Sequence, residues 1–174
     1  MVRELHGSLE GSGLRVCVLA SRWNTFVTEK LVEGAVRKLR EAGVYEDDIE
    51  VAWVPGAFEL PVAAKWAAET GAFDAVVCLG AVIRGETAHF EYVAGGAAQG
   101  IARVALDTGI PVAFGVLTCD TAAQAMARAG GKAGHKGEEA AATAIEMARL
   151  RQLLRDGHEA SRSGGERAQG KGAR

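Results

Sequence analysis

Residues 83–90, I-R-G-E-T-A-H-F, place chemically active residue types directly after an apolar run, A-V-V-C-L-G-A-V. His89 carries an imidazole, the side chain whose proton moves near neutral pH. The segment 85–87 lies just before a predicted helix, where free backbone N–H groups can hold a phosphate. Each signal is weak alone, because most lone histidines are structural and many turns contain glycine and threonine. Together they make the segment a candidate for binding an anion and for moving a proton.

Polar and aromatic residues also follow the other predicted strands. The segments are 21–24 (S-R-W-N), 55–59 (P-G-A-F-E) and 118–121 (T-C-D-T). In an open parallel sheet, ligands bind outside the carboxyl ends of the strands, so these segments are candidates for one site. The rings of Trp23 and Phe58 suit a flat, polar ring held by stacking and hydrogen bonds.

Each of these residues also has a structural explanation. Trp23 and Phe58 are of types that usually belong to a core. Glu59 could simply favour the N-terminus of the next helix, and Arg128, near a helix end, is a cation that the helix dipole favours. Composition and spacing therefore predict an anionic, ring-like ligand, but they leave the reaction open.

Strands and helices alternate along the chain and must position these residues. Apolar runs predict strands at 14–20, 49–54, 74–82 and 111–117. Helical spacing and capping residues predict helices that begin near Asn24 or Thr25, Pro61, Glu91, Thr121 and Glu138. Gln124 is expected to reach back to the N–H of Thr121 in a capping box, and that helix to end near Gly130. The order predicts an α/β fold, a four-stranded parallel sheet with helices on both faces.

The composition divides the chain into three parts. Residues 1–13 contain three glycines and two serines and are expected to form a flexible arm. Residues 14–156 form the predicted domain, in which 132–137 (K-A-G-H-K-G) is expected to be a loop. Residues 157–174 consist mainly of Gly, Ser, Arg, Lys and Gln, which predicts a disordered basic tail.

Charge and composition exclude several classes of protein. The net charge is −2, so no general basic field attracts nucleic acid or an anionic membrane, and the apolar runs are too short to cross a bilayer. The N-terminus lacks the apolar segment of a secretory signal, which favours the cytoplasm. Cys17, Cys78 and Cys119 lack the spacing of a zinc site or a disulfide framework and are expected to be buried thiols. P-loop, Rossmann, nucleophile-elbow and zinc-deaminase motifs are absent from the sequence.

Five ordered blocks over residues 14–154 resemble one known family. The blocks are A-S-R-W-N, P-G-A-F-E-L-P, L-G-A-V-I-R-G-E-T-A-H-F-E-Y, F-G-V-L-T and R-A-G-G-K-A-G-H-K-G-E-E-A. They resemble the lumazine synthases, which implies a flavodoxin-like three-layer sandwich. The implied transferase reaction condenses 5-amino-6-(D-ribitylamino)uracil with 3,4-dihydroxy-2-butanone 4-phosphate, the penultimate step of riboflavin synthesis. It needs neither a metal nor an organic cofactor.

The resemblance also implies a role for each matching residue. His89 would carry protons for imine formation and phosphate elimination. The pyrimidine and ribityl groups would contact Trp23, Ala57, Phe58, Glu59, Ala81, Val82 and Ile83, with Phe114 contributed by a neighbouring subunit. The phosphate would contact Gly85, Glu86 and Thr87 and the neighbour's Arg128, while Asn24 and Lys136 are further candidates for the same site.

The same resemblance implies that the chain assembles with copies of itself. Family members form pentamers or shells of sixty subunits, and the short connection 128–137 favours the shell. Riboflavin synthase is a further candidate partner. Two residues depart from the family pattern, since His135 stands where asparagine is common and Ala57 where serine is common. Any side-chain hydrogen bond from position 57 is therefore lost.

Two other functions stay open at this point. A riboflavin synthase of the archaeal type would share the fold and use the lumazine as both substrates. A non-enzymatic shell protein that binds lumazine or flavin would keep the aromatic residues without needing His89 or Arg128. Because the sequence retains both residues, it favours the enzyme.

Overall fold

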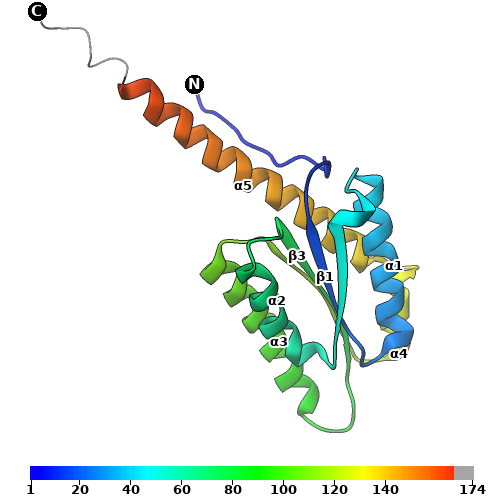
Figure 1. Ribbon diagram of the computed structural model, residues 1–174. Coiled ribbons are helices and arrows are strands. Elements are labelled where there is room, and N and C mark those ends of the chain that lie inside the picture. Colours follow the sequence, from blue (N-terminus) through cyan, green and yellow to red (C-terminus); the bar gives the residue numbers. More distant parts are fainter. Residues whose placement is uncertain (167–174) are drawn as a thin grey trace, which may run out of the picture.

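The computed structural model describes the backbone of residues 1–166 and the side chains of residues 1–157. The main elements are β1 (Val16–Ser21), α1 (Thr25–Glu41), β2 (Ile49–Val54), α2 (Leu60–Glu69), β3 (Ala75–Ile83), α3 (His89–Thr108), β4 (Val112–Cys119), α4 (Ala122–Ala127) and α5 (Lys136–Glu166). Two short 3-10 helices, Glu46–Asp48 and Ala57–Glu59, flank β2, and a small hairpin of β5 (Ala129–Gly131) and β6 (Gly134–His135) precedes α5 (Figure 1).

Strands β1 to β4 form one parallel sheet in the order β2-β1-β3-β4, which confirms the predicted α/β fold. This is the flavodoxin-like order, in which the chain reverses direction across the sheet between β1 and β3. All residues of β1 and all but the last of β3 are buried, because these central strands are covered on both faces. β2 lies at an edge and is largely exposed.

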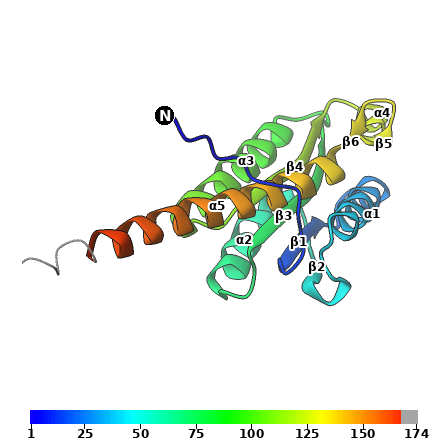
Figure 2. The same cartoon turned by 90° about the horizontal axis from the view of Figure 1, so that it is seen from above.

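Helices cover both faces of the sheet and make it a three-layer sandwich (Figures 1 and 2). One core lies between the sheet and α1 and α5, where Val18, Leu31 and Ile145 are fully buried. A second core lies between the sheet and α2 and α3, around Leu60 and Ile101. The alternation of apolar runs and helices thus predicted that helices cover both faces, but not which helix covers which face.

Helix α1 packs closely against α5 and the hairpin through glycines. A Cβ atom on Gly137 would lie 2.1 Å from the carbonyl oxygen of Leu31, so the two helices approach through their backbones. The imidazole of His135 occupies the space beside Gly34, where a Cβ atom would lie 2.0 Å from its Cε1. The expectation of an irregular loop at 132–137 was wrong, because these contacts and the pairing of Ala129 with His135 organise a hairpin.

The capping predictions need two corrections. Asn24 precedes α1 with a left-handed φ of 65°, and its side chain does not cap the helix; its Nδ2 donates instead to the carbonyl oxygen of Ala81 at 2.8 Å. Thr121 does cap α4, accepting from the N–H of Gln124 at 3.2 Å. The side-chain oxygen of Gln124, however, accepts from the N–H of Asp120 and not from that of Thr121.

Three helix boundaries also differ from prediction. Helix α3 begins at His89 and not at Glu91, so the imidazole lies in its first turn, and α4 ends at Ala127, before the predicted Gly130. Helix α5 continues to Glu166, beyond the start of the predicted disordered tail at 157, because extending an existing helix costs little. The rest of that predicted tail, 167–174, lies outside the described residues.

The N-terminal arm contains no helix or strand in residues 1–13, but its end is attached to the domain. The guanidinium of Arg149 donates to the carbonyl oxygens of Glu10 and Ser12, each at 2.6 Å. The N–H of Gly11 donates to the carbonyl oxygen of Ala42 at 2.7 Å. The expectation of a flexible arm therefore does not extend to residues 10–12.

The three cysteines are free and buried, as predicted. Burial raises the pKa of the Cys17 thiol to about 11, so it stays protonated at neutral pH. Within residues 1–166, no helix has both the length and the apolar composition needed to cross a membrane.

Candidate active site

A cavity of about 650 Å³ opens at the carboxyl edge of the sheet. Its walls come from the turn after β1, the segment after β2, the end of β3 and the first turn of α3. It brings together most of the predicted site residues: Trp23, Ala57, Phe58, Glu59, Ala81, Val82, Ile83, Gly85, Thr87 and His89. The rule that ligands bind beyond strand ends grouped the residues after β1, β2 and β3 correctly, but the segment 118–121 after β4, which the same rule included, does not line the cavity.

The aromatic residues of the cavity do not belong to the core. Trp23 is 72% exposed and Phe58 is 59% exposed, so the structural explanation for these two rings is wrong. Tyr92, which the sequence reasoning missed, lines the same cavity and is 75% exposed. Its position three residues after His89 on a helix puts both side chains on one face, a spacing that could have identified it.

His89 is the first residue of α3 and faces this cavity. Its backbone N–H donates to Oγ1 of Thr87 at 3.4 Å. Its imidazole has no hydrogen-bond partner among the described residues, so both ring nitrogens are available to a ligand. This arrangement suits a group that takes a proton from a bound substrate and returns it.

The backbone of the segment 85–87 offers a site for an anion. The N–H groups of Gly85, Glu86 and Thr87 donate to no acceptor within the part of the chain that the structure describes. The space around Gly85 is open, since an added Cβ atom would meet nothing within 4 Å. Unpaired N–H groups just before a helix favour an anionic ligand such as a phosphate. The side chain of Glu86 does not line the cavity.

Glu59 has the structural role that its sequence position suggested. Its Oε2 accepts from the N–H of Gly56 at 2.9 Å, as in a capping box. The other carboxylate oxygen makes no hydrogen bond to a described residue, and Glu59 lines the cavity. Glu59 can therefore hold its own turn and accept a hydrogen bond from a ligand at the same time.

No lysine or arginine of the described residues lines the cavity. Arg128 is the C-cap residue of α4 and does not line the cavity; its Nη1 donates to the carbonyl oxygen of Gln124 at 3.0 Å. Arg128 forms no ion pair with a carboxylate of residues 1–157, so its charge is available to an anionic group from outside this part of the chain. A phosphate bound at 85–87 would have N–H donors from this chain but no cation.

The remaining predicted site residues also lie outside the cavity wall. Asn24 is engaged with the Ala81 carbonyl, and Nζ of Lys136 pairs with Glu139 at 2.7 Å. Phe114 is 42% exposed on β4, the strand at the edge of the sheet opposite β2. Within residues 1–157, no three His, Cys, Asp or Glu side chains gather in a way that could hold a metal ion.

Comparison with protein families agrees with the resemblance noted in the sequence. The family model described as 6,7-dimethyl-8-ribityllumazine synthase matches residues 13–152 of the 174-residue chain. The match spans the whole sheet, the cavity, Arg128 and the hairpin that follows it. The chain therefore belongs to the 6,7-dimethyl-8-ribityllumazine synthase family.

Proposed function

We propose that the protein condenses 5-amino-6-(D-ribitylamino)uracil with 3,4-dihydroxy-2-butanone 4-phosphate to 6,7-dimethyl-8-ribityllumazine, with release of phosphate and water. One observation carries the proposal: a single cavity contains exposed aromatic rings, an unpartnered imidazole and unpaired backbone N–H groups. Its volume of about 650 Å³ lies in the usual range of sites for small molecules. Family membership supports lumazine formation in riboflavin synthesis.

The uracil ring is expected to lie against Trp23 and Phe58. Flat rings stack on exposed aromatic side chains, and the free oxygen of Glu59 can accept a hydrogen bond from a uracil N–H. Ala81, Val82 and Ile83, at the end of β3, supply the apolar surface that excludes water from the reacting groups. Holding two reactants in this arrangement accounts for much of the expected rate enhancement.

His89 is expected to move the protons that the reaction requires. The substrate amine attacks the ketone, and loss of water from the adduct needs a proton on the departing oxygen. Loss of phosphate then needs removal of a proton from carbon. An imidazole without a competing partner can perform both transfers in turn.

The phosphate completes its site with a cation from a second copy of the chain. Arg128 has no ion-pair partner among residues 1–157 and does not line the cavity of its own chain, whereas the cavity holds N–H donors without a cation. A guanidinium matches a phosphate with two parallel hydrogen bonds. A homo-oligomer that places Arg128 and Phe114 at the neighbour's cavity would supply both missing groups.

A second groove supports assembly with further copies. It has a volume of about 770 Å³ and lies between the end of α3, β4 and α5. Leu106 in its wall is 84% exposed and Met147 is 46% exposed. Apolar side chains gathered in one groove are costly to leave in water, and the adjoining edge strand β4 carries Phe114, so we assign the groove to a neighbouring subunit.

The direct test mixes the purified protein with both substrates and follows the lumazine product by its absorbance. We expect product to form faster than in a control without protein. A rate equal to that control would contradict the proposal and favour a binding protein. Riboflavin formed from lumazine alone would instead identify a riboflavin synthase.

The shared site can be tested by combining two impaired variants, assayed with the butanone phosphate well below its KM. His89→Ala and Arg128→Ala chains, refolded together in equal amounts, should regain activity because about a quarter of the shared sites then contain both native residues. Each variant refolded alone provides the control. Activity no higher than the mean of the two controls would contradict a site built from two chains.

A further inference from the structure

Arg84 lies beside the cavity without lining it, and its side chain joins three elements. Its Nε donates to Oδ1 of Asp120, just beyond β4, at 2.9 Å, and its Nη1 lies 3.5 Å from Oε1 of Glu91 in the first turn of α3. The guanidinium carbon is 4.4 Å from the ring centroid of Phe90. The backbone N–H of Arg84 donates to the carbonyl oxygen of Cys119 at 2.8 Å, which continues the pairing of β3 with β4.

The segment 85–88, which separates Arg84 from α3, has few attachments of its own. The N–H groups of residues 85–87 are unpaired within the described chain. The bond from the His89 N–H to Thr87 is long, at 3.4 Å, and Ala88, at the N-cap, offers no side-chain cap. The position of this segment therefore depends on how its two ends are held.

Arg84 contributes to both ends. Its backbone holds the start of the segment at the sheet, and its side chain holds Phe90 and Glu91, the two residues directly after His89. The hydrogen bond to Asp120, followed by the charges of Asp120 and Glu91, raises the pKa of Arg84. Because these carboxylates neutralise its charge, Arg84 is not free to serve as the phosphate's cation.

We propose that Arg84 is a positioning residue, whose contacts with Asp120, Phe90 and Glu91 fix the segment 85–88 and the first turn of α3. The N–H groups and His89 then face the same bound substrate. The catalytic consequence rests on the proposed function, whereas the ordering of the segment can be measured without substrate. The side chain of Arg84 is 44% exposed, so its ion pairs add little to global stability. Loss of the Arg84 side chain should therefore change the order of this segment strongly and the stability of the whole domain little.

The test compares Arg84→Gln and Arg84→Lys with a matched control, Arg103→Gln. Arg103 lies on α3 and, like Arg84, pairs with a carboxylate, that of Asp107, at 3.2 Å. Hydrogen exchange of amides 91–95, which are hydrogen-bonded in the first turns of α3, should speed up by about tenfold or more in Arg84→Gln and stay unchanged in the control, as read by mass spectrometry. Arg84→Lys should recover part of the protection, because an ammonium can reach Asp120 but cannot form the planar fork.

Kinetics provide the second readout. In Arg84→Gln, kcat should fall by about tenfold to a hundredfold, because a small displacement of a catalytic group has a large effect on rate. KM for the butanone phosphate should rise, because the backbone N–H groups of 85–87 that bind its phosphate are displaced. KM for the pyrimidine should change by less than about twofold. The melting temperature should change little, whereas loss of a purely structural residue would lower it.

Exchange of amides 91–95 at the wild-type rate in Arg84→Gln would overturn the proposal. So would kcat and KM values within about twofold of wild type. If Arg84→Gln does not fold, Asp120→Asn and Glu91→Gln each remove one partner of Arg84, and unchanged exchange in both would overturn it equally. A wild-type protein that forms no lumazine would refute the proposed function, while the exchange experiment would still decide the role of Arg84.

Discussion

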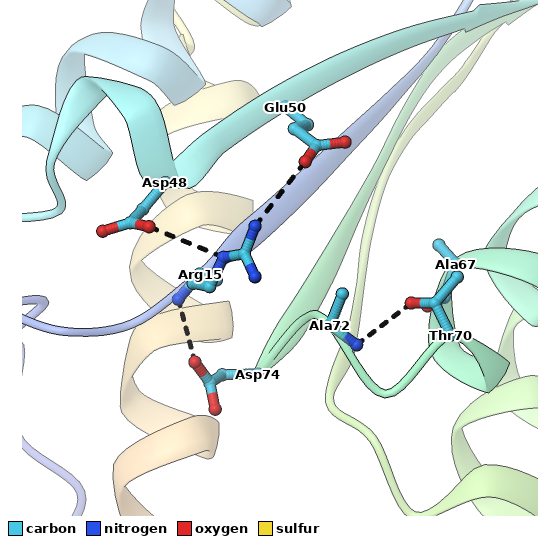
Figure 3. Close-up of polar contacts among 7 residues, drawn as sticks. All are labelled: Arg15, Asp48, Glu50, Ala67, Thr70, Ala72 and Asp74. Carbon is cyan, nitrogen blue, oxygen red and sulfur yellow. Dashed lines mark hydrogen bonds and ion pairs between the residues drawn. The ribbon is translucent and has the colours of Figure 1, made fainter.

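The two ends of the parallel sheet differ in how their polar groups are satisfied. At the amino end, the N–H of Arg15 donates to Oδ2 of Asp74 at 2.8 Å, and its guanidinium lies 3.5 Å from Asp48 and 3.9 Å from Glu50 (Figure 3). Thr70, nearby, donates to its own helix and accepts from the turn that follows. At this end of the sheet, these polar groups pair with other groups of the same chain.

At the carboxyl end, the chain leaves partners missing. The imidazole of His89, one oxygen of Glu59 and the N–H groups of 85–87 have no partner among the described residues, and Trp23 remains mostly exposed. Exposed aromatic rings and unpaired donors do not contribute to folding, so their presence in one cavity indicates a ligand. The polar groups of the amino end thus maintain the fold, whereas the carboxyl end carries the unpaired groups on which the proposed binding depends.

Replacing His89 should produce the largest change at the carboxyl end. In His89→Ala we expect kcat to fall about a hundredfold, at the low end of the range for acid–base catalysis, because the substrates are still held together. The melting temperature should not fall, since the ring has no partner to lose. Steady-state kinetics and thermal unfolding measure both. A wild-type kcat would remove His89 from the chemistry.

Arg128→Ala should chiefly affect binding of the butanone phosphate. Loss of charge-assisted hydrogen bonds is expected to raise its KM by about tenfold to a hundredfold, with a smaller change for the pyrimidine. Lys132→Ala, in the turn of the following hairpin, is the control for removing a nearby positive charge. Unchanged kinetics towards the phosphate substrate in Arg128→Ala would contradict the assignment of Arg128.

A pair of adjacent glycines in α3 allows a finer test of the cavity wall. A Cβ atom on Gly96 would lie 2.7 Å from the ring of Phe58, whereas one on Gly95 would meet nothing within 4 Å. Gly96→Ala should displace the ring and raise KM for the pyrimidine several-fold, roughly 1 kcal/mol. Gly95→Ala should keep the wild-type KM and stabilise the helix by up to about 1 kcal/mol. Equal KM values in the two variants would contradict the stacking role of Phe58.

At the amino end, the expected effect is smallest and concerns stability alone. Asp74→Ala removes the acceptor of the Arg15 N–H and should lower the free energy of unfolding by about 1 kcal/mol. Asp47→Ala, in the 3-10 helix before β2, is the control, because the side chain of Asp47 makes no hydrogen bond or ion pair within residues 1–157. Denaturant titration measures the difference. Neither variant should change kcat or KM, and a change in either would break the contrast between the two ends.

The regular elements and the site's location were predictable from the sequence because both depend on local pattern. Buried parallel strands require continuous apolar runs, and strand ends in such a sheet lie at one edge, so the residues after β1, β2 and β3 had to meet. The exposure of Trp23 and Phe58 was not predictable, because residue type alone favours a core. Family resemblance, not pattern, supplied the reaction.

The features that the sequence did not predict depend on one contact between distant segments and on two local details of geometry. The hairpin before α5 forms because His135 fits against Gly34, about a hundred residues away in sequence, and no local signal encodes that contact. The side-chain oxygen of Gln124 accepts from the N–H of Asp120, four residues earlier, and not from that of Thr121, three residues earlier. Tyr92 was missed because α3 was expected to begin at Glu91, and its true start places Tyr92 on the same face as His89.

Asn24 has a consequence for how freely this sequence can vary. Its backbone adopts a φ of 65°, which favours glycine or asparagine, and its side chain must donate to the Ala81 carbonyl. Glycine meets the first requirement without the second, aspartate would place an acceptor against an acceptor, and glutamine fits the backbone poorly. In a saturation mutagenesis screen, this position outside the cavity wall should accept fewer residue types than Trp23 inside it, where other flat rings can stack.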